Sequence, residues 1–177
     1  FVYSGEVMLY NLTKHGNRKV IFILGKGQLL NQSIVSKKPN ALFCEATCPV
    51  KVIEIAEEQF LQLMEQSHAL TRAVLREYER NLWRMGHQLK NTTGNMQMER
   101  KIAAKLWKLG RDFGVDTEDG VMIDIDLTIT LMADLVGAPR ENVSRACKVL
   151  TDRGLIRYGN KRFTLTDSDG LADFYKM

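Results

Sequence analysis

Four polar side chains between positions 140 and 145 have the types and the spacing that recognition of another molecule would need. At helical spacing they fall mostly on one face, because the apolar residues of the same stretch recur on the other face. The four are Arg140, Glu141, Ser144 and Arg145, and the inward residues are Val143, Ala146, Val149 and Leu150. Forked donors near the start of a short helix indicate an element that reads DNA.

A second short helix must hold that face in place, and residues 129–136 supply its apolar pattern. Thr128 can cap this helix, because its hydroxyl can accept an otherwise unpaired first-turn N–H. Gly137 ends the helix, and Pro139 suits the opening of the next one, where its missing N–H costs nothing. Two short helices around a glycine turn predict a helix-turn-helix.

A β-hairpin is predicted directly after these helices. Residues 155–158 and 162–165 form short strand patterns around a turn at residues 159–161, which makes the hairpin the wing of a winged helix. Between positions 140 and 162 the chain carries seven Lys or Arg against two acidic residues. Such an excess of cationic side chains favours binding to DNA phosphates, because each contact releases counterions from the DNA. An ordinary solvated surface on a small α/β domain is the alternative, but pattern, turn chemistry and charge agree on the wing.

The rest of the chain predicts an α+β protein in three parts. Residues 1–56 form short antiparallel strands of a jelly-roll-like β-roll, and residues 41–48 and 50–55 form a hairpin within it. Helices are expected at residues 57–66, 67–91 and 96–113, followed by an acidic loop at 116–120 and a strand at 121–125. We expect a partial β-roll domain at residues 1–66, a long helix with a hinge at 67–95, and a winged helix-turn-helix domain at 96–177.

The long helix carries a narrow apolar stripe with spacings of three and four residues. The stripe consists of Leu75, Tyr78, Leu82, Met85 and Leu89. Such a stripe is typical of the seam of a two-stranded coiled coil, whereas a globular core normally needs a wider one. Packing on its own domain is the alternative. The opposite, polar face is expected to include Arg84 and Gln88, and the weak helix formers of residues 92–95 are the candidate hinge.

Composition and hydropathy indicate neither a membrane-spanning segment nor a signal peptide. With 177 residues, 45% hydrophobic residues, 26% charged residues and a net charge of +4, the chain has the composition of a globular protein with one or two modest cores. No apolar run approaches the roughly 20 residues that a bilayer requires, and no signal peptide is recognisable. The chain begins at Phe1 within a strand-like run, so we expect a preceding N-terminal portion.

Neither a metal centre nor an enzyme active site is indicated. Cys44 and Cys48 would lie roughly 13 Å apart along an extended strand, too far for a disulfide or one metal ion. His15, His68 and His87 are scattered. No catalytic Ser-His-Asp or Cys-His set, carboxylate pair or nucleotide loop occurs at usable spacing. Three cysteines without framework spacing favour a reducing cytoplasm.

The order of these parts resembles the CRP/FNR family of bacterial transcription regulators, and the resemblance covers essentially the whole chain. Its most specific part is LTITLMADLVGAPRENVSR at residues 127–145, followed by KVLTDRGLI at residues 148–156. Leu131 departs from the family pattern, where an acidic or amide side chain would complete a capping box. The resemblance implies an effector-sensing β-roll, a dimerisation helix and a DNA-binding domain, in that order.

This resemblance assigns roles to individual side chains. The base-reading residues would be Arg140, Glu141, Ser144 and Arg145. Arg145 would bind O6 and N7 of a guanine and Glu141 would accept from a cytosine amino group, so a G·C pair is expected in each half-site. The contacts to the DNA backbone would be Thr128, Asn142, Lys148, Lys161 and Arg162.

The sensor domain departs further from the family. In relatives that bind cyclic nucleotides a Glu holds the ribose and an Arg-Ser pair holds the cyclic phosphate, whereas this chain has Gln32 and Asn40-Ala41. Without that Arg a buried phosphate loses its bidentate, charge-assisted partner, so cyclic AMP is not the expected effector. No cofactor is evident, and the pocket would take a small, largely apolar or neutral molecule. Its expected lining is Leu30, Asn31, Gln32, Ser33, Leu82, Met85 and Gly86; packing of loop on helix without a ligand is the alternative.

The expected function is a sequence-specific, DNA-binding transcription regulator that is not an enzyme. Double-stranded DNA and a second copy of the chain are the expected partners, RNA polymerase is a further one by the resemblance, and no membrane is involved. Two alternatives stay open: a winged-helix module that binds protein, and a regulator that needs no effector. Salt distinguishes the first, because DNA binding weakens steeply as salt rises and an apolar protein interface does not.

Overall fold

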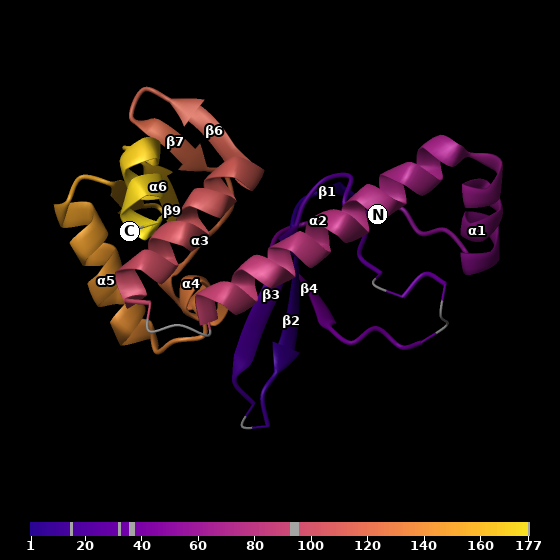
Figure 1. Ribbon diagram of the computed structural model, residues 1–177, viewed down its shortest axis with the longest axis horizontal. Helices are drawn as coiled ribbons and strands as arrows, with labels where there is room; N and C mark the ends of the chain where they lie inside the picture. Colours follow the sequence, from indigo (N-terminus) through magenta and orange to yellow (C-terminus); the bar gives the residue numbers. More distant parts are fainter. Residues whose placement is uncertain (15, 32, 36–37, 93–95, 177) are drawn as a thin grey trace. The chain divides into compact units, whose positions relative to one another are not determined.

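The structure has the α+β fold that the sequence predicts (Figure 1). The computed structural model describes residues 1–14, 16–31, 33–35, 38–92 and 96–176, without the side chains of residues 90–92. Close contacts divide the chain into two compact units: Phe1–Asn11 with Ile21–Thr93, and Leu12–Val20 with Gly94–Met177. Gln32 and residues 93–95 of the expected hinge lie outside the described residues. The division of the chain after residues 66 and 95 stays a prediction.

The N-terminal part of the chain forms short antiparallel strands. They are β1 (Val2–Ser4), β2 (Val7–Leu12), β3 (Arg18–Leu24), β4 (Phe43–Ala46) and β5 (Lys51–Val52). One sheet has the order β3-β2-β4, and a second sheet pairs β1 with β5. The predicted hairpin of residues 41–48 and 50–55 is therefore wrong. Strand β4 pairs with β2, where Phe43 lies opposite Tyr10, and β5 pairs with β1, where Val52 lies opposite Val2.

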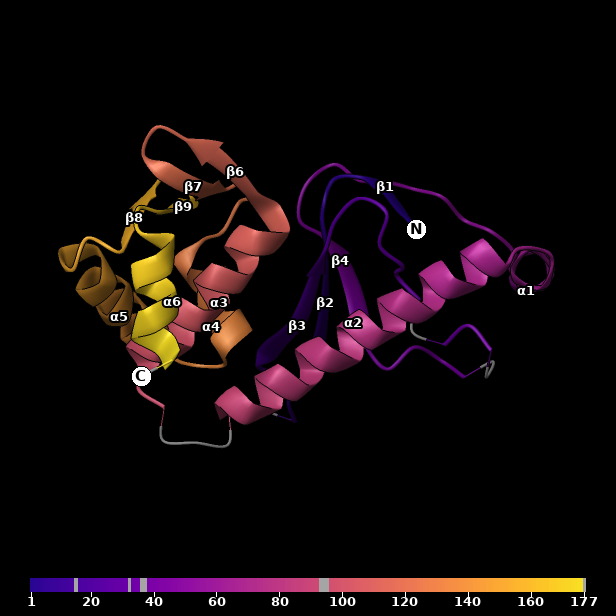
Figure 2. The same cartoon turned by 45° about the horizontal axis from the view of Figure 1, so that its top comes forward.

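Two predicted helices follow, α1 (Glu57–Gln66) and α2 (His68–Thr92). Figure 2 shows α1 end-on, with α2 leading away from it. Ser67 separates them and stabilises the start of α2, because its Oγ accepts from the N–H of Leu70 at 3.2 Å. Ile34, Phe60 and Val74 form a buried cluster that holds α1, α2 and the preceding loop together. No helix in the described part of the chain combines the length and apolar character needed for a membrane crossing.

The C-terminal part of the chain packs helices on a four-stranded sheet of order β6-β7-β9-β8. Its elements are α3 (Met98–Phe113), β6 (Gly114–Thr117), β7 (Gly120–Ile123), α4 (Ile129–Val136), α5 (Arg140–Asp152), β8 (Ile156–Gly159), β9 (Arg162–Leu165) and α6 (Ser168–Lys176). The core is formed by fully buried residues on α3, α5, β9 and α6: Ile102, Leu106, Val143, Leu150, Phe163 and Leu171. The loop predicted at residues 116–120 is wrong in part, because β6 pairs with β7 from Gly114 to Thr117. Helix α6 has no counterpart in the sequence prediction.

The wing hairpin has a tighter turn than its sequence suggests. Gly159 pairs with Arg162, so two residues, Asn160 and Lys161, form the turn instead of three. Their φ angles are 51° and 59°. Positive φ at both central positions is the pattern of a type I′ turn, whose twist matches that of the flanking strands. The turn therefore presents Lys161 at the tip of the hairpin.

Candidate nucleic-acid interface

Helix α4 and the turn after it form as the sequence predicts. The hydroxyl of Thr128 accepts from the N–H of Leu131 at 3.1 Å, which caps α4. Gly137 ends the helix in the left-handed conformation, at φ 71°, and its N–H donates to the carbonyl of Ala133. Pro139 precedes α5 at the N-cap position instead of occupying its first turn, so the helix begins at Arg140. The Thr128 hydroxyl, expected at the DNA backbone, is engaged in this cap.

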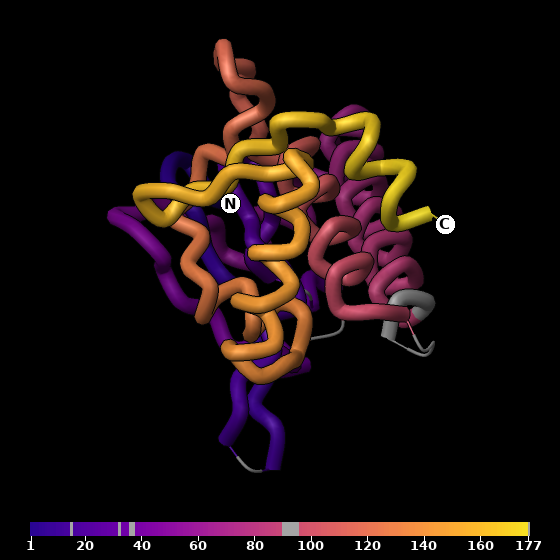
Figure 3. Tube along the Cα trace, turned by 90° about the vertical axis from the view of Figure 1, so that its left-hand side faces the viewer, coloured from indigo at the N-terminus to yellow at the C-terminus, as the bar shows by residue number. Residues whose placement is uncertain are grey.

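Helix α5 separates its apolar and polar residues as a reading helix requires. Val143, Ala146, Cys147 and Leu150 are buried, and Val149 is only half-buried. The exposed residues are Arg140, Glu141, Ser144, Arg145 and Lys148. Figure 3 shows α5 (orange) facing the viewer, with the β8–β9 hairpin (gold) beside it. The structure therefore brings the four candidate reading residues together on one solvent-facing side.

Arg145 is exposed and bonded to a neutral partner. Its Nη2 donates to Oδ1 of Asn142, one turn earlier in α5, at 2.5 Å. Asn142 is half-buried, and its backbone N–H donates to the carbonyl of Pro139 at 3.1 Å. No carboxylate neutralises the guanidinium among the described residues, so its positive charge faces solvent.

The wing presents its cations differently. Arg162 forms an ion pair with Asp124, and Arg157 on β8 forms one with Asp119 at 2.6 Å. Lys161 is exposed at the turn, and its carbonyl accepts from the N–H of Leu127 at 2.7 Å, which ties the tip of the wing to the segment that enters α4. Of the three wing cations, Lys161 is thus the one without a carboxylate partner in the described part of the chain.

The described members of the expected effector pocket differ in their surroundings. Leu30 packs against the buried cluster of Leu9, Phe22 and Leu24, Asn31 is exposed, and Ser33 is half-buried. On α2, Leu82 and Met85 are 73% and 47% exposed, and Gly86 faces open space. The three helix residues therefore lie on a solvent-facing side of α2.

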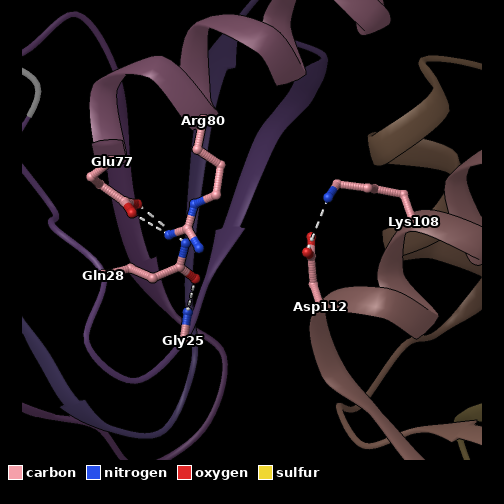
Figure 4. Close-up of polar contacts among 6 residues, drawn as sticks. All are labelled: Gly25, Gln28, Glu77, Arg80, Lys108 and Asp112. Carbon is pink, nitrogen blue, oxygen red and sulfur yellow. Dashed lines mark hydrogen bonds and ion pairs between the residues drawn. The ribbon is translucent and has the colours of Figure 1, made fainter. Parts of the chain in front are cut away.

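A different side of α2 packs on its own sheet. Glu77, Asn81, Arg84 and Gln88 recur at spacings of four, three and four residues. Figure 4 shows Glu77 accepting from Nε2 of Gln28, and Nε2 of Gln88 donates to the carbonyl of Ile21 on β3 at 2.8 Å. Arg84 and Gln88, expected on the polar face opposite the apolar stripe, lie on this packed side: Arg84 is 7% exposed and Gln88 is half-buried.

The apolar stripe of α2 is left uncovered in the single chain. Its five members, Leu75, Tyr78, Leu82, Met85 and Leu89, are between 37% and 73% exposed. Burying these large apolar side chains against another surface would be favourable, because apolar surface exposed to water is unfavourable. The polar side of the same helix is already packed. The apolar face of α2 is therefore the exposed one, and its polar face is the one packed on the sheet.

The three cysteines differ in their surroundings. Cys44 is exposed on β4, and the thiol of Cys48 donates to Oε2 of Glu6 at 3.0 Å. Cys147 is buried in α5, and burial raises the pKa of its thiol to about 11, so the thiol is protonated at neutral pH. Within the described residues no group of three or more His, Cys, Asp or Glu side chains could hold a metal ion.

Comparison with known proteins matches both parts of the chain to families. Residues 1–67 match the cyclic nucleotide-binding domain, and residues 100–174 match the Crp-like helix-turn-helix domain. The two models cover the sensor sheet and the winged helix in the order in which these occur here. The first model implies a small-molecule effector without naming it for this chain.

Curated relatives align with almost the whole chain. A CRP-like cAMP-activated global transcriptional regulator of Mycobacterium tuberculosis (strain CDC 1551 / Oshkosh) is 24% identical over 97% of this chain and 76% of its own length. A global nitrogen regulator of Nostoc sp. (strain PCC 7120) is 24% identical over 93% of this chain and 75% of its length. These names differ in what they describe, so they assign no effector to this chain.

A solved structure shows the same fold. FixK2 from Bradyrhizobium japonicum superposes with a TM-score of 0.80 at 19% identity, covering 97% of this chain and 84% of that protein. The relatives are transcription regulators and not enzymes. From the two domain matches, their order and these relatives, the protein belongs to the CRP/FNR family of DNA-binding transcription regulators.

Proposed function

We propose that the protein is a homodimeric, sequence-specific regulator that reads an inverted repeat. The observation that carries this proposal is the exposed row of Arg140, Glu141, Ser144 and Arg145 on one side of α5. Each α5 enters a major groove, and the two grooves lie about 34 Å apart on one face of the duplex. Arg145 binds guanine O6 and N7, and Glu141 accepts from a cytosine amino group.

Phosphate contacts position the reading helix without specifying sequence. Lys148 and Lys161 are exposed and form no ion pair among the described residues, which supports this role for both. Thr128 and Arg162 are engaged by the cap of α4 and by Asp124 respectively. We therefore assign the main backbone contacts to the two lysines.

A second copy of the chain is the partner proposed for α2. The stripe has the spacing of a two-stranded seam, and the opposite side of the helix is already packed on its own sheet. A parallel helix pair along this stripe would cover all five apolar residues. It would also relate two α5 helices by the twofold axis that an inverted repeat requires.

The proposed effector is a small molecule other than cyclic AMP. Asn40 and Ala41, which stand where relatives hold the cyclic phosphate, are exposed and carry no charge. Binding would favour the dimer population that fits the operator, with a coupling of about 1–3 kcal/mol. In a thermal-shift titration, cyclic AMP is expected to leave the melting temperature unchanged; a rise that saturates with cyclic AMP concentration would contradict this.

Selection from randomised duplexes tests the DNA-binding proposal. Wild-type protein is expected to enrich inverted repeats with a G·C pair in each half-site. Fluorescence anisotropy then compares the selected operator, a single half-site and a scrambled duplex at several salt concentrations. Equal binding to the operator and the scrambled duplex would sink the proposal.

The seam is tested separately by Leu82→Glu. Because Leu82 is 73% exposed, the substitution leaves the folded chain intact and places a charge in the proposed interface. Sedimentation velocity is expected to show a monomer, with operator binding reduced to that of a half-site. Trp83→Glu is the matched control, since Trp83 is also exposed on α2 but lies off the stripe. A dimer that survives Leu82→Glu places the interface elsewhere.

A further inference from the structure

We infer that Asn142 is a positioning residue, which orients the guanidinium of Arg145 toward the base that it reads. This inference rests on the proposed function and assigns Asn142 a role different from the backbone contact expected from its sequence position. The contact that carries it is the hydrogen bond from Arg145 Nη2 to Asn142 Oδ1, at 2.5 Å. Both residues lie in the first half of α5, three positions apart, so they are neighbours on the helix surface.

The side chain of Asn142 is shorter and less exposed than that of Arg145. Asn142 lies in the first turn of α5, where its N–H donates to the carbonyl of Pro139, and its side chain is half-buried. Arg145 is exposed, and a long arginine side chain loses much rotamer freedom when it is ordered. A short, partly buried amide can therefore restrict the longer side chain before DNA arrives, which lowers the entropic cost of binding.

The hydrogen bond leaves the reading fork intact. A guanidinium has five N–H donors, and the bond to Asn142 uses one of them. The second N–H of Nη2 and those of Nη1 and Nε remain for the two acceptors of guanine. The acceptor is an uncharged amide oxygen, so it does not offset the positive charge of Arg145 as the carboxylate of an ion pair would.

The roles of positioning residue and backbone contact require opposite halves of the Asn142 amide. Positioning uses the oxygen, which accepts from Arg145. A phosphate contact would use the NH2 group, which donates to phosphate oxygen. Asn142→Ala removes both halves, whereas Asn142→Asp keeps an acceptor and loses the donor. The pair of variants therefore separates the two roles.

A double-mutant cycle provides the measurement. Wild type, Asn142→Ala, Asn142→Asp, Arg145→Ala and Asn142→Ala/Arg145→Ala are titrated with the operator selected by wild type and with the same duplex changed at the G·C pair that Arg145 reads. The ratio of the two Kd values is the discrimination at that pair, and it cancels effects common to all DNA. Asp152→Ala is the matched control, because Asp152 is exposed at the end of the same helix. Thermal melting checks that every variant is folded.

Asn142→Ala is expected to reduce discrimination roughly threefold to tenfold, the value of one hydrogen bond. In the Arg145→Ala background the same substitution is expected to change nothing, and Asn142→Asp is expected to retain discrimination. An equal loss on both duplexes that persists without Arg145, with the salt slope unchanged because an amide carries no charge, would establish the phosphate contact and overturn the inference. Unchanged discrimination in Asn142→Ala also overturns it. Loss of wild-type discrimination, by contrast, refutes the proposed function itself.

Discussion

Helix α5 and the β8–β9 hairpin each carry three cationic side chains but present them in opposite ways. Among the described residues, Arg140, Arg145 and Lys148 on α5 form no ion pair with a carboxylate. In the hairpin, two of the three cations, Arg157 and Arg162, are paired with Asp119 and Asp124. Charge content alone therefore does not identify a phosphate-binding surface.

Sheet register explains the ion pair of Arg162 in the hairpin. Val121 lies opposite Leu165 and Met122 opposite Thr164, and continuing this register places Asp124 across from Arg162. Cross-strand neighbours of opposite charge attract each other at that separation. On α5, helical spacing places both Glu141 and Asn142 about one turn before Arg145, and the guanidinium hydrogen-bonds to the amide of Asn142. The two surfaces therefore differ in whether a carboxylate is paired with the cation: Arg157 and Arg162 form ion pairs across the sheet, whereas Arg145 bonds to an amide within its helix.

The largest expected effect is that of substituting Arg145 on α5, compared with substituting Lys148 on the same helix. Arg145→Ala is expected to cost roughly 1–3 kcal/mol on the operator and to reduce discrimination at the G·C pair. Lys148→Ala removes the same charge from the same exposed face and is expected to weaken all duplexes alike. Anisotropy titrations with operator and scrambled DNA measure both. Equal behaviour of the two variants would show that α5 binds phosphates only.

An intermediate effect is expected from the wing. Lys161→Ala is expected to weaken binding to every duplex and to lower the slope of log K against log salt by about 0.9, because one phosphate contact is lost. Arg162→Ala removes a neighbouring cation that Asp124 already neutralises, so its effect on the slope is expected to be smaller. The matched pair is measured between about 50 and 200 mM salt. A larger slope change for Arg162→Ala would contradict the comparison.

The helix-turn-helix could be predicted from the sequence because its signals are local. Thr128 caps the helix that follows it, and Gly137 supplies the left-handed residue at its end. The apolar spacing of α5 correctly places Val143, Ala146 and Leu150 inside. Each of these signals acts within about four residues, so neighbouring positions suffice to predict the outcome.

The features missed from the sequence depend on partners far along the chain. Strands β4 and β5 look like a hairpin, yet they pair with β2 and β1. Arg84 belongs to a charged helix face, but that side of α2 packs on a sheet, where Gln88 bonds to Ile21 at a separation of 67 residues in the sequence. The ion pair of Arg162 joins residues 38 positions apart. Such contacts are set by topology and register, which composition and periodicity do not encode.

The smallest expected effect is that of removing the two carboxylates that pair with the arginines of the hairpin. Asp124→Asn and Asp119→Asn each free an arginine on an exposed surface where the ion pair itself is worth about 0–1 kcal/mol. If the freed cation reaches a phosphate, the salt slope is expected to steepen by about 0.9 for each substitution. Binding at low salt is expected to tighten slightly on operator and scrambled DNA together.

Glu118→Gln is the control for these two substitutions, because Glu118 is an exposed carboxylate next to Asp119 that forms no ion pair among the described residues. It removes the same negative charge without releasing an arginine. A steeper slope in Asp124→Asn and Asp119→Asn but not in Glu118→Gln assigns the effect to the freed guanidinium groups. Equal slopes in all three would mean that only net charge matters, and that α5 and the wing differ less than their ion pairs imply.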